Sequence, residues 1–180
     1  MIVGLGHQAQ VGKDTAAQIL VDGYGFKRLA FADRLKQMAF DINPMVGTGV
    51  RYAPTHLARL VDQVGFEKAK EDPEVRRFLQ NLGVAARDNL GEDVWVRVVL
   101  DQITADLRQD WVITDVRFPN EFDTLNGLGW LVKITRPGVE TNAGTHVSET
   151  ALADYDWDYT IRNDGTIQDL ESKLVKVLGL

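Results

Sequence analysis

The feature that most constrains the fold is a glycine-rich loop between a short strand and a helix, close to the start of the sequence. Ile2 and Val3 begin the strand, the loop closes on Gly12 and Lys13, and an apolar helical pattern follows. Strand, glycine loop and helix in this order form a phosphate-binding loop, or P-loop, in which backbone N–H groups and the helix N-terminus point at the phosphates. The lysine neutralises the β- and γ-phosphate oxygens. We therefore predict a nucleotide site here.

This loop departs from the common pattern GxxxxGK[ST] in two ways. Gly6 and Gly12 are one residue too far apart, and Asp14 replaces the hydroxyl that usually follows the lysine. A carboxylate is a good ligand for Mg²⁺, so Asp14 is a candidate metal ligand, directly or through water. The alternative is a chance Gly-Lys turn with an ordinary acid in the first helical turn. The candidate ATP contacts in the loop are Gly6, Gln10, Val11, Gly12, Lys13, Asp14 and Thr15.

Strands and helices alternate along the rest of the chain, without an internal repeat or a low-complexity linker. This alternation predicts a single α/β domain over residues 1–180, with a mainly parallel sheet flanked by helices. A glycine- and proline-containing segment at 43–55 reads as a loop. Further strands are predicted at 27–32, 111–115, 130–135 and 158–161, and helices at 33–40, 55–70, 74–90, 94–107, 120–128 and 166–177.

Charge and composition narrow the functional classes. A net charge of −6 offers no basic surface for gripping a nucleic-acid polymer, although a few local arginines can still bind a nucleotide. The absence of cysteine excludes disulfides and thiolate metal sites and fits a reducing cytoplasm. The first residues do not read as a signal peptide, and no run approaches the ~20 apolar residues of a membrane span. We predict a soluble cytoplasmic protein with small-molecule partners, no nucleic-acid polymer and no membrane.

A second acidic anchor follows the apolar run at 111–115. P-loop enzymes place an acid at the end of a strand next to the loop, where it helps to hold the magnesium shell. Asp115 has this position, which makes it a candidate metal residue. Arg117, two residues on, would stabilise the charge on the transferring phosphoryl group. The alternatives are a plain turn residue for Asp115 and a surface ion pair for Arg117.

The predicted helix at 74–90 carries two stripes at 100° per residue. One is apolar, and the other, which we call the arginine stripe, consists of Arg76, Gln80, Gly83 and Arg87. Two arginines flanking an amide, with a glycine giving room, suit a phosphate and a polar ring. Scattered arginines on a helix more often mark a solvated face, and that alternative stays open. The apolar stripe consists of Val75, Phe78, Leu79, Leu82, Ala86 and Leu90.

Three further polar residues follow predicted strands. Asp33 is expected to be the N-cap of a helix and is also a candidate for orienting or deprotonating the attacking group. Lys36 lies one turn on and would face either an anion or water. Arg136 ends the strand at 130–135 and is a candidate phosphate or adenine contact, or else a surface arginine.

An ordered set of motifs resembles the bacteriophage-type deoxynucleoside monophosphate kinases over nearly the whole chain. Each motif is modest alone, and the ordered set is specific. The motifs are Gly12-Lys13-Asp14-Thr15, Phe31-Ala32-Asp33-Arg34-Leu35-Lys36, Arg76-x-x-Leu79-Gln80-x-Leu82-Gly83, Gly91-Glu92-Asp93-Val94-Trp95-Val96, Asp115-Val116-Arg117-Phe118-Pro119-Asn120-Glu121 and His146-x-Ser148-Glu149.

This resemblance implies a three-layer P-loop kinase fold of the nucleoside-monophosphate-kinase type, with a helical acceptor-binding insertion at about 43–107 and a lid loop at about 137–146. It implies transfer of the ATP γ-phosphate to a deoxynucleoside 5′-monophosphate with Mg²⁺, in host cytoplasm if the protein is phage-encoded. Lys13 and the loop amides would hold ATP. A homodimer is compatible with the family. The acceptor site would be lined by Arg76, Gln80, Arg87 and Arg117, with Asp33 and Lys36 as further candidates.

Two alternatives compete with this function. One is a P-loop kinase for another small acceptor, such as a coenzyme precursor. The other is a non-catalytic module that binds nucleotide without transferring phosphate. Two expected phosphate-binding regions, the P-loop and the arginine stripe, favour an enzyme.

Overall fold

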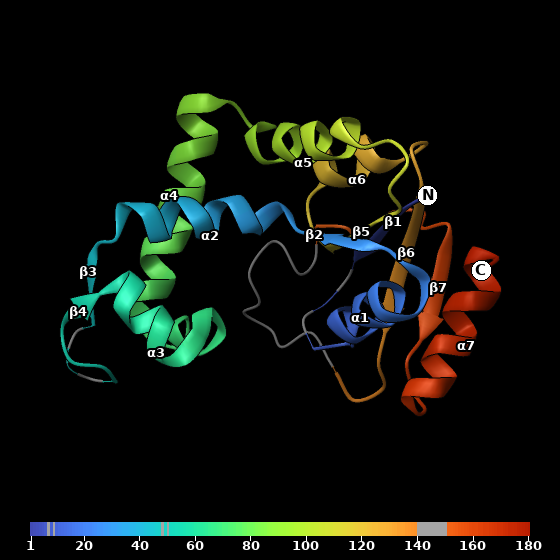
Figure 1. Ribbon diagram of the computed structural model, residues 1–180, viewed down its shortest axis with the longest axis horizontal. Helices are drawn as coiled ribbons and strands as arrows, with labels where there is room; N and C mark the ends of the chain where they lie inside the picture. The colour runs from blue at the N-terminus through green and yellow to red at the C-terminus, as the bar shows by residue number, and fades with distance from the viewer. Residues whose placement is uncertain (7, 9, 48, 50, 140–150) are drawn as a thin grey trace. The chain divides into compact units, whose positions relative to one another are not determined.

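A computed structural model describes residues 1–6, 8, 10–47, 49, 51–139 and 151–180 (Figure 1). The described chain forms two compact units. The first joins Met1–Phe31 to Val96–Leu180, and the second is the continuous segment Ala32–Trp95. The helical unit therefore starts and ends earlier than the insertion expected at 43–107. That both units work as one domain stays a prediction.

The first unit is built on a five-stranded sheet in the order β2-β5-β1-β6-β7, in which all neighbouring strands are parallel. Parallel neighbours need crossover connections, which the helices between the strands supply. The prediction of a mainly parallel α/β sheet is confirmed. The strands are β1 (Ile2–Gly6), β2 (Lys27–Leu29), β5 (Trp111–Val116), β6 (Trp130–Thr135) and β7 (Tyr159–Arg162).

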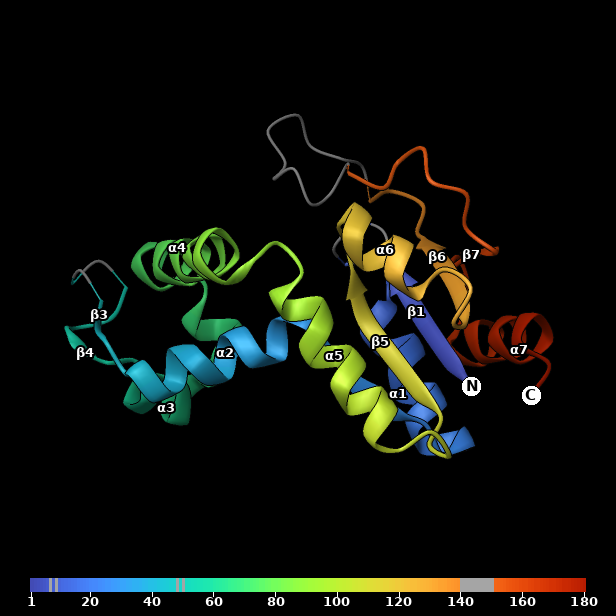
Figure 2. The same cartoon turned by 90° about the horizontal axis from the view of Figure 1, so that it is seen from above.

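Helices cover both faces of this sheet, so the first unit has three layers (Figures 1 and 2). Successive strand residues point to opposite faces. Val3 and Leu5 join the core beneath α1 (Lys13–Tyr24) and α7 (Ile167–Leu178). A Cβ on the intervening Gly4 would meet Leu125 and Leu131 on the other face. That face is covered by α5 (Val94–Ala105) and α6 (Pro119–Leu125).

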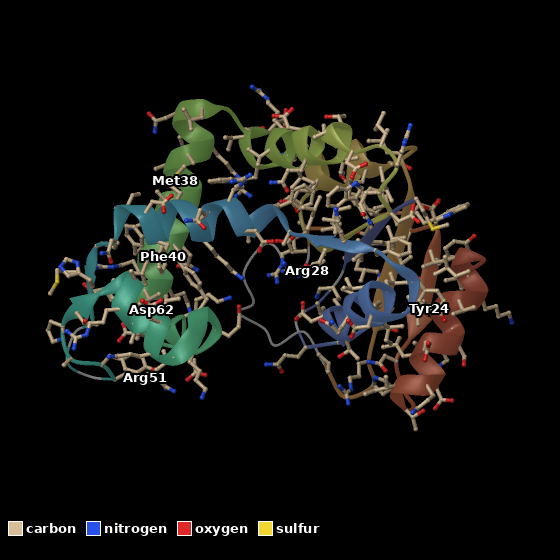
Figure 3. The ribbon with its side chains drawn as sticks, viewed as in Figure 1. Tyr24, Arg28, Met38, Phe40, Arg51 and Asp62 are labelled. Atoms are coloured by element: carbon tan, nitrogen blue, oxygen red, sulfur yellow. The ribbon has the colours of Figure 1, made fainter. Side chains whose placement is uncertain are left out.

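The second unit is mainly helical and has its own apolar core. Residues such as Leu57, Leu60 and Val75 are completely buried in it. Within this unit Arg51, which is labelled in Figure 3, pairs with Glu71. The elements of this unit are β3 (Met45–Val46), β4 (Thr55–His56), α3 (Leu57–Ala69), α4 (Pro73–Leu90) and most of α2 (Phe31–Ile42).

Two expectations about local structure were wrong. The predicted strand at 27–32 ends at Leu29, and α2 begins at Phe31, so Asp33 lies inside the first helical turn and is not the N-cap. The reason is a distant contact: Asp115 Oδ1 accepts the Phe31 N–H at 2.8 Å, so a neighbouring strand supplies the oxygen for this helix start. The segment at 43–55, predicted as loop throughout, contains β3 and the first residue of β4, which pair antiparallel.

Within the described ranges, no helix combines the length and apolarity needed to cross a bilayer.

Candidate active site

The P-loop lies at the carboxyl edge of the sheet, where parallel α/β folds bind their ligands. β1 ends at Gly6, and the loop returns as α1 at Lys13. β5 pairs with β1 and places Val116 opposite Gly6, so Asp115 reaches the same edge. β6 flanks β1 on its other side and ends next to Arg136. The topology thus brings together the sequence-predicted Lys13, Asp115 and Arg136 at one edge of the first unit.

Lys13 is held inside the loop. Its side chain is only 7% exposed, and its ammonium group donates to the Gln8 carbonyl oxygen. Gly12, which precedes it, has φ +105°, a backbone conformation that favours glycine. Gln10 has φ +62°. These dihedral angles curl the backbone into a turn from which α1 starts, so that the N–H groups of its first turn face the loop.

Packing explains two other residues of the loop. Val11 is 1% exposed and belongs to the sheet core, so only its backbone is placed to meet a nucleotide. A Cβ on Gly6 would lie 1.9 Å from the ring of Trp157, so this glycine admits the indole. Asp14 and Thr15 are exposed on the first turn of α1.

Arg117 is positioned by a residue that sequence reasoning did not single out. Glu121 is 3% exposed, and its Oε2 accepts the backbone N–H groups of Arg117 at 2.8 Å and Phe118 at 3.0 Å. The same carboxylate belongs to a capping arrangement at the start of α6, with Pro119 in the first turn. Proline at the first helical position and an acid two residues later are a helix-start signal that could have identified Glu121. α6 begins at Pro119, one residue before the helix predicted at 120–128, and ends at Leu125.

The donors for Mg²⁺ fit an open site. In the described part of the chain, no three or more His, Cys, Asp or Glu side chains gather into a metal-binding group. Mg²⁺ usually takes one or two carboxylates and completes its shell with water and substrate phosphates. Asp14 and Asp115 are two such carboxylates. Asp115 Oδ1 accepts the Phe31 N–H. The residues therefore fit a metal that arrives with the nucleotide.

The arginine stripe lies on α4 of the second unit. Arg76 and Gln80 are exposed and Arg87 is half-buried. Gly83 is buried, and a Cβ there would meet Leu35 of α2 at 3.5 Å. The expectation that Gly83 leaves room for a ligand was therefore wrong, because the neighbouring helix fills that space.

Two more expectations concern the same unit. Leu90, assigned to the apolar stripe, is 59% exposed because it is the last residue of α4. Lys36 pairs with Glu67 at 3.5 Å and lies 6.0 Å from the centre of the Phe66 ring, so α3 holds its ammonium group. Asp33 is half-buried in the first turn of α2.

The expected lid loop at 137–146 lies mostly outside the described residues, as do His146 and Glu149. Arg136, just before it, is exposed.

Comparison with known proteins decides the family. The profile of the family described as deoxynucleotide monophosphate kinase matches residues 49–174. The chain belongs to the deoxynucleotide monophosphate kinase family. It is therefore an enzyme of the phosphotransferase class, as the ordered motifs predict.

Individual relatives agree with this membership. The chain is 32% identical to a mimivirus protein (Acanthamoeba polyphaga mimivirus) with the provisional name deoxynucleotide monophosphate kinase, over 97% of this chain and 94% of that one. It is also 32% identical to the deoxynucleotide monophosphate kinase of Escherichia phage RB69, over 58% of this chain and 44% of the phage protein.

A solved structure supports the fold. The dephospho-CoA kinase of Campylobacter jejuni superposes with a TM-score of 0.52, covering 99% of this chain and 95% of that one at 14% identity. At this identity the likeness shows the fold alone. The prediction of a P-loop kinase fold is confirmed.

Proposed function

We propose that this kinase transfers the γ-phosphoryl group of ATP to a deoxynucleoside 5′-monophosphate and releases ADP and the diphosphate. The observation that carries the proposal is the buried Lys13 in a strand–loop–helix at the carboxyl edge of the sheet, beside β5, which carries Asp115 next to its last residue. Family membership names the acceptor class.

Phosphoryl transfer requires positioning and charge neutralisation more than covalent chemistry. The loop amides and Lys13 bind the β- and γ-phosphates. Arg117 stabilises the charge on the transferring group, with its backbone fixed by Glu121. Asp14 and Asp115 would hold Mg²⁺, which neutralises phosphate oxygens when bound. In this proposal the exposed Arg136 contacts the ATP phosphates or adenine.

The arginine stripe binds the acceptor in this proposal. Arg76 and Arg87 are charged donors that match a phosphate group, and Gln80 between them offers an amide for a polar ring. Asp33 orients the attacking phosphate oxygen. Lys36 takes a lesser part, because its ammonium group is already paired with Glu67.

The test is a coupled ADP-release assay with ATP and Mg²⁺ across dAMP, dCMP, dGMP, dTMP and their ribose counterparts. We expect turnover with at least one deoxynucleotide. Turnover only with a coenzyme precursor would move the acceptor to another class. ATP binding without ADP release from any acceptor would identify a binding module. We further propose that the substrates are its small-molecule partners and that it acts in host cytoplasm; sedimentation would test the expected homodimer.

A further inference from the structure

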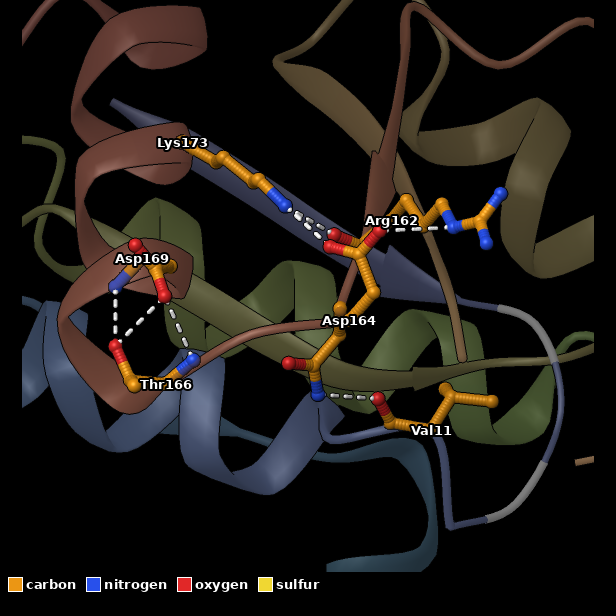
Figure 4. Close-up of polar contacts among 7 residues, drawn as sticks. Val11, Arg162, Asp164, Thr166, Asp169 and Lys173 are labelled. Atoms are coloured by element: carbon orange, nitrogen blue, oxygen red, sulfur yellow. Dashed lines mark hydrogen bonds and ion pairs between the residues drawn. The ribbon is translucent and has the colours of Figure 1, made fainter. Parts of the chain in front are cut away.

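A side chain from the far end of the sequence holds the P-loop. Asn163 follows β7, and its Nδ2 donates to the Val11 carbonyl oxygen at 2.9 Å (Figure 4). The backbone N–H of Asn163 donates in turn to the Thr135 carbonyl oxygen at 2.7 Å, at the end of β6. The asparagine is thus anchored to the sheet while its amide group reaches across to the loop.

This contact fixes the direction of a backbone N–H group that can donate a hydrogen bond to a phosphate. The peptide between Val11 and Gly12 is trans and planar, so its C=O and N–H point in opposite directions. Because Asn163 holds the carbonyl, the Gly12 N–H is directed away from Asn163. The next peptide is also fixed, since the Gly12 carbonyl accepts the first helical bond of α1 from the Ala16 N–H at 2.9 Å.

The fit between Asn163 and the loop is close. A Cβ on Gly12 would lie 2.3 Å from Asn163 Nδ2, a separation that real Cβ atoms do not show. Position 12 therefore requires glycine for two reasons: its φ is positive, and the Asn163 amide approaches too closely for a Cβ.

The loop that carries Asn163 is braced by contacts that do not involve its side chain (Figure 4). Lys173 of α7 donates to the Arg162 carbonyl oxygen at 2.7 Å and pairs with Asp164 at 2.8 Å. Arg162 pairs with Asp164 at 2.9 Å. The residues on both sides of Asn163 are thus tied to α7, Arg162 by its carbonyl oxygen and Asp164 by its carboxylate, so the brace and the amide contact can be tested separately.

We propose that Asn163 is a positioning residue for ATP: its side-chain amide holds the Val11 carbonyl and so directs the Gly12 N–H toward the phosphates. The inference rests on the proposed use of the P-loop for ATP. Without the amide, the peptide is free to rotate, and its carbonyl oxygen then competes for the place where a phosphate oxygen sits.

The sharpest test is Asn163→Asp, which keeps the shape but replaces the donor with an acceptor at neutral pH. Measured by titration calorimetry without acceptor, the ATP dissociation constant should rise about ten- to hundredfold, the range expected when a partly buried hydrogen bond becomes a repulsion. The KM for the deoxynucleotide should stay within about twofold, because that substrate does not use this peptide. Asn163→Ala removes the donor without adding charge and should show a smaller loss of the same kind.

Asp164→Asn is the matched control. It is also isosteric and lies one residue away, but it weakens the brace and not the amide contact. It should keep the ATP affinity of the wild type. The proposal is overturned if Asn163→Asp and Asn163→Ala bind ATP normally, or if Asp164→Asn loses as much affinity as they do. A wild type that binds ATP but phosphorylates no deoxynucleotide would refute the proposed function and leave this inference standing.

Discussion

Under the proposed function the P-loop and the arginine stripe both bind phosphate, but they are built in opposite ways. In the P-loop, Val11 and Lys13 are buried, and Gly12 is shaped by its φ of +105° and by Asn163. On α4, Arg76 and Gln80 are exposed, and Leu35 of α2 occupies the space beside Gly83.

This difference separates two kinds of phosphate site. A backbone site is preorganised, so binding orders few groups but depends on local geometry. A site of long side chains must order each arginine at a cost of up to about 2 kcal/mol in rotamer entropy, yet it can adapt to different acceptors. We therefore expect changes in the P-loop to have large, all-or-none effects and changes in the stripe to have graded effects.

The largest effect is expected from Lys13→Ala. Loss of a preorganised charge at the transferring phosphate should lower kcat/KM for ATP by about 10²- to 10³-fold. Steady-state kinetics with ATP as the varied substrate measure this. Lys176→Ala, which changes an exposed lysine on α7, is the control and should leave kcat/KM unchanged. Near-normal turnover of Lys13→Ala would refute the P-loop assignment.

Gly12→Ala should come next. The alanine would be strained at the positive φ, and its Cβ would clash with the Asn163 amide. ATP affinity should therefore fall steeply, and the free energy of unfolding should drop by about 1–3 kcal/mol. Gly25→Ala separates the two causes, because Gly25 also has a positive φ (+73°) but a Cβ there has no neighbour within 4 Å. Calorimetry and denaturant unfolding should show a stability loss in both variants and an ATP defect only in Gly12→Ala.

The arginine stripe should respond less strongly. Arg76→Ala and Arg87→Ala should each raise the KM for the deoxynucleotide by about tenfold, the usual cost of one charge-assisted hydrogen bond, while the KM for ATP stays constant. Arg77→Ala is the control, because Arg77 is 72% exposed and pairs with Glu74 on its own helix. If Arg77→Ala matches the other two variants, the stripe is only a solvated face.

The smallest effect is expected in how the stability of the fold depends on acid pH, and it comes from the region that braces Asn163. The hydrogen bond from Lys173 lowers the pKa of Asp164, and the backbone N–H of Thr166 lowers the pKa of Asp169. Carboxylates with a lowered pKa stabilise the fold above their ordinary value of about 4, and this stabilisation is lost as pH falls below it. The Asp169→Asn variant should therefore lose less stability between pH 5 and about pH 3 than the wild type does. Thermal unfolding across this pH range measures the difference. An unchanged pH profile would contradict this.

Sequence reasoning succeeded where the pattern is local. β6 was predicted at its observed bounds, and α4 within one residue, because alternation and helical periodicity are set by neighbouring residues. The strand–loop–helix and the apolar strand that ends in an acid also indicated that Lys13 and Asp115 lie at the carboxyl edge of the sheet, where the structure has them; their roles stay predictions.

Contacts between distant segments could not be predicted in this way. Asp115 lies 84 residues from Phe31 and accepts its N–H where α2 starts. Asp33 therefore lies inside the helix and not at the N-cap position that the local sequence predicted. Leu35 occupies the space beside Gly83 that a helical wheel leaves empty. Asn163 acts on Val11 across 152 residues, and nothing in the local sequence of either residue indicates the pairing.

The strand order has a consequence for synthesis on the ribosome. Among the described residues, β1, which leads into the P-loop, pairs with β5 and β6, and β2 pairs with β5, so neither early strand has one of these partners until residues 111–116 have been made. The helical unit is one continuous segment that is complete at Trp95. Because long-range parallel pairing is slow and local contacts form first, we expect nascent chains to assemble the helical second unit before the sheet that carries the P-loop.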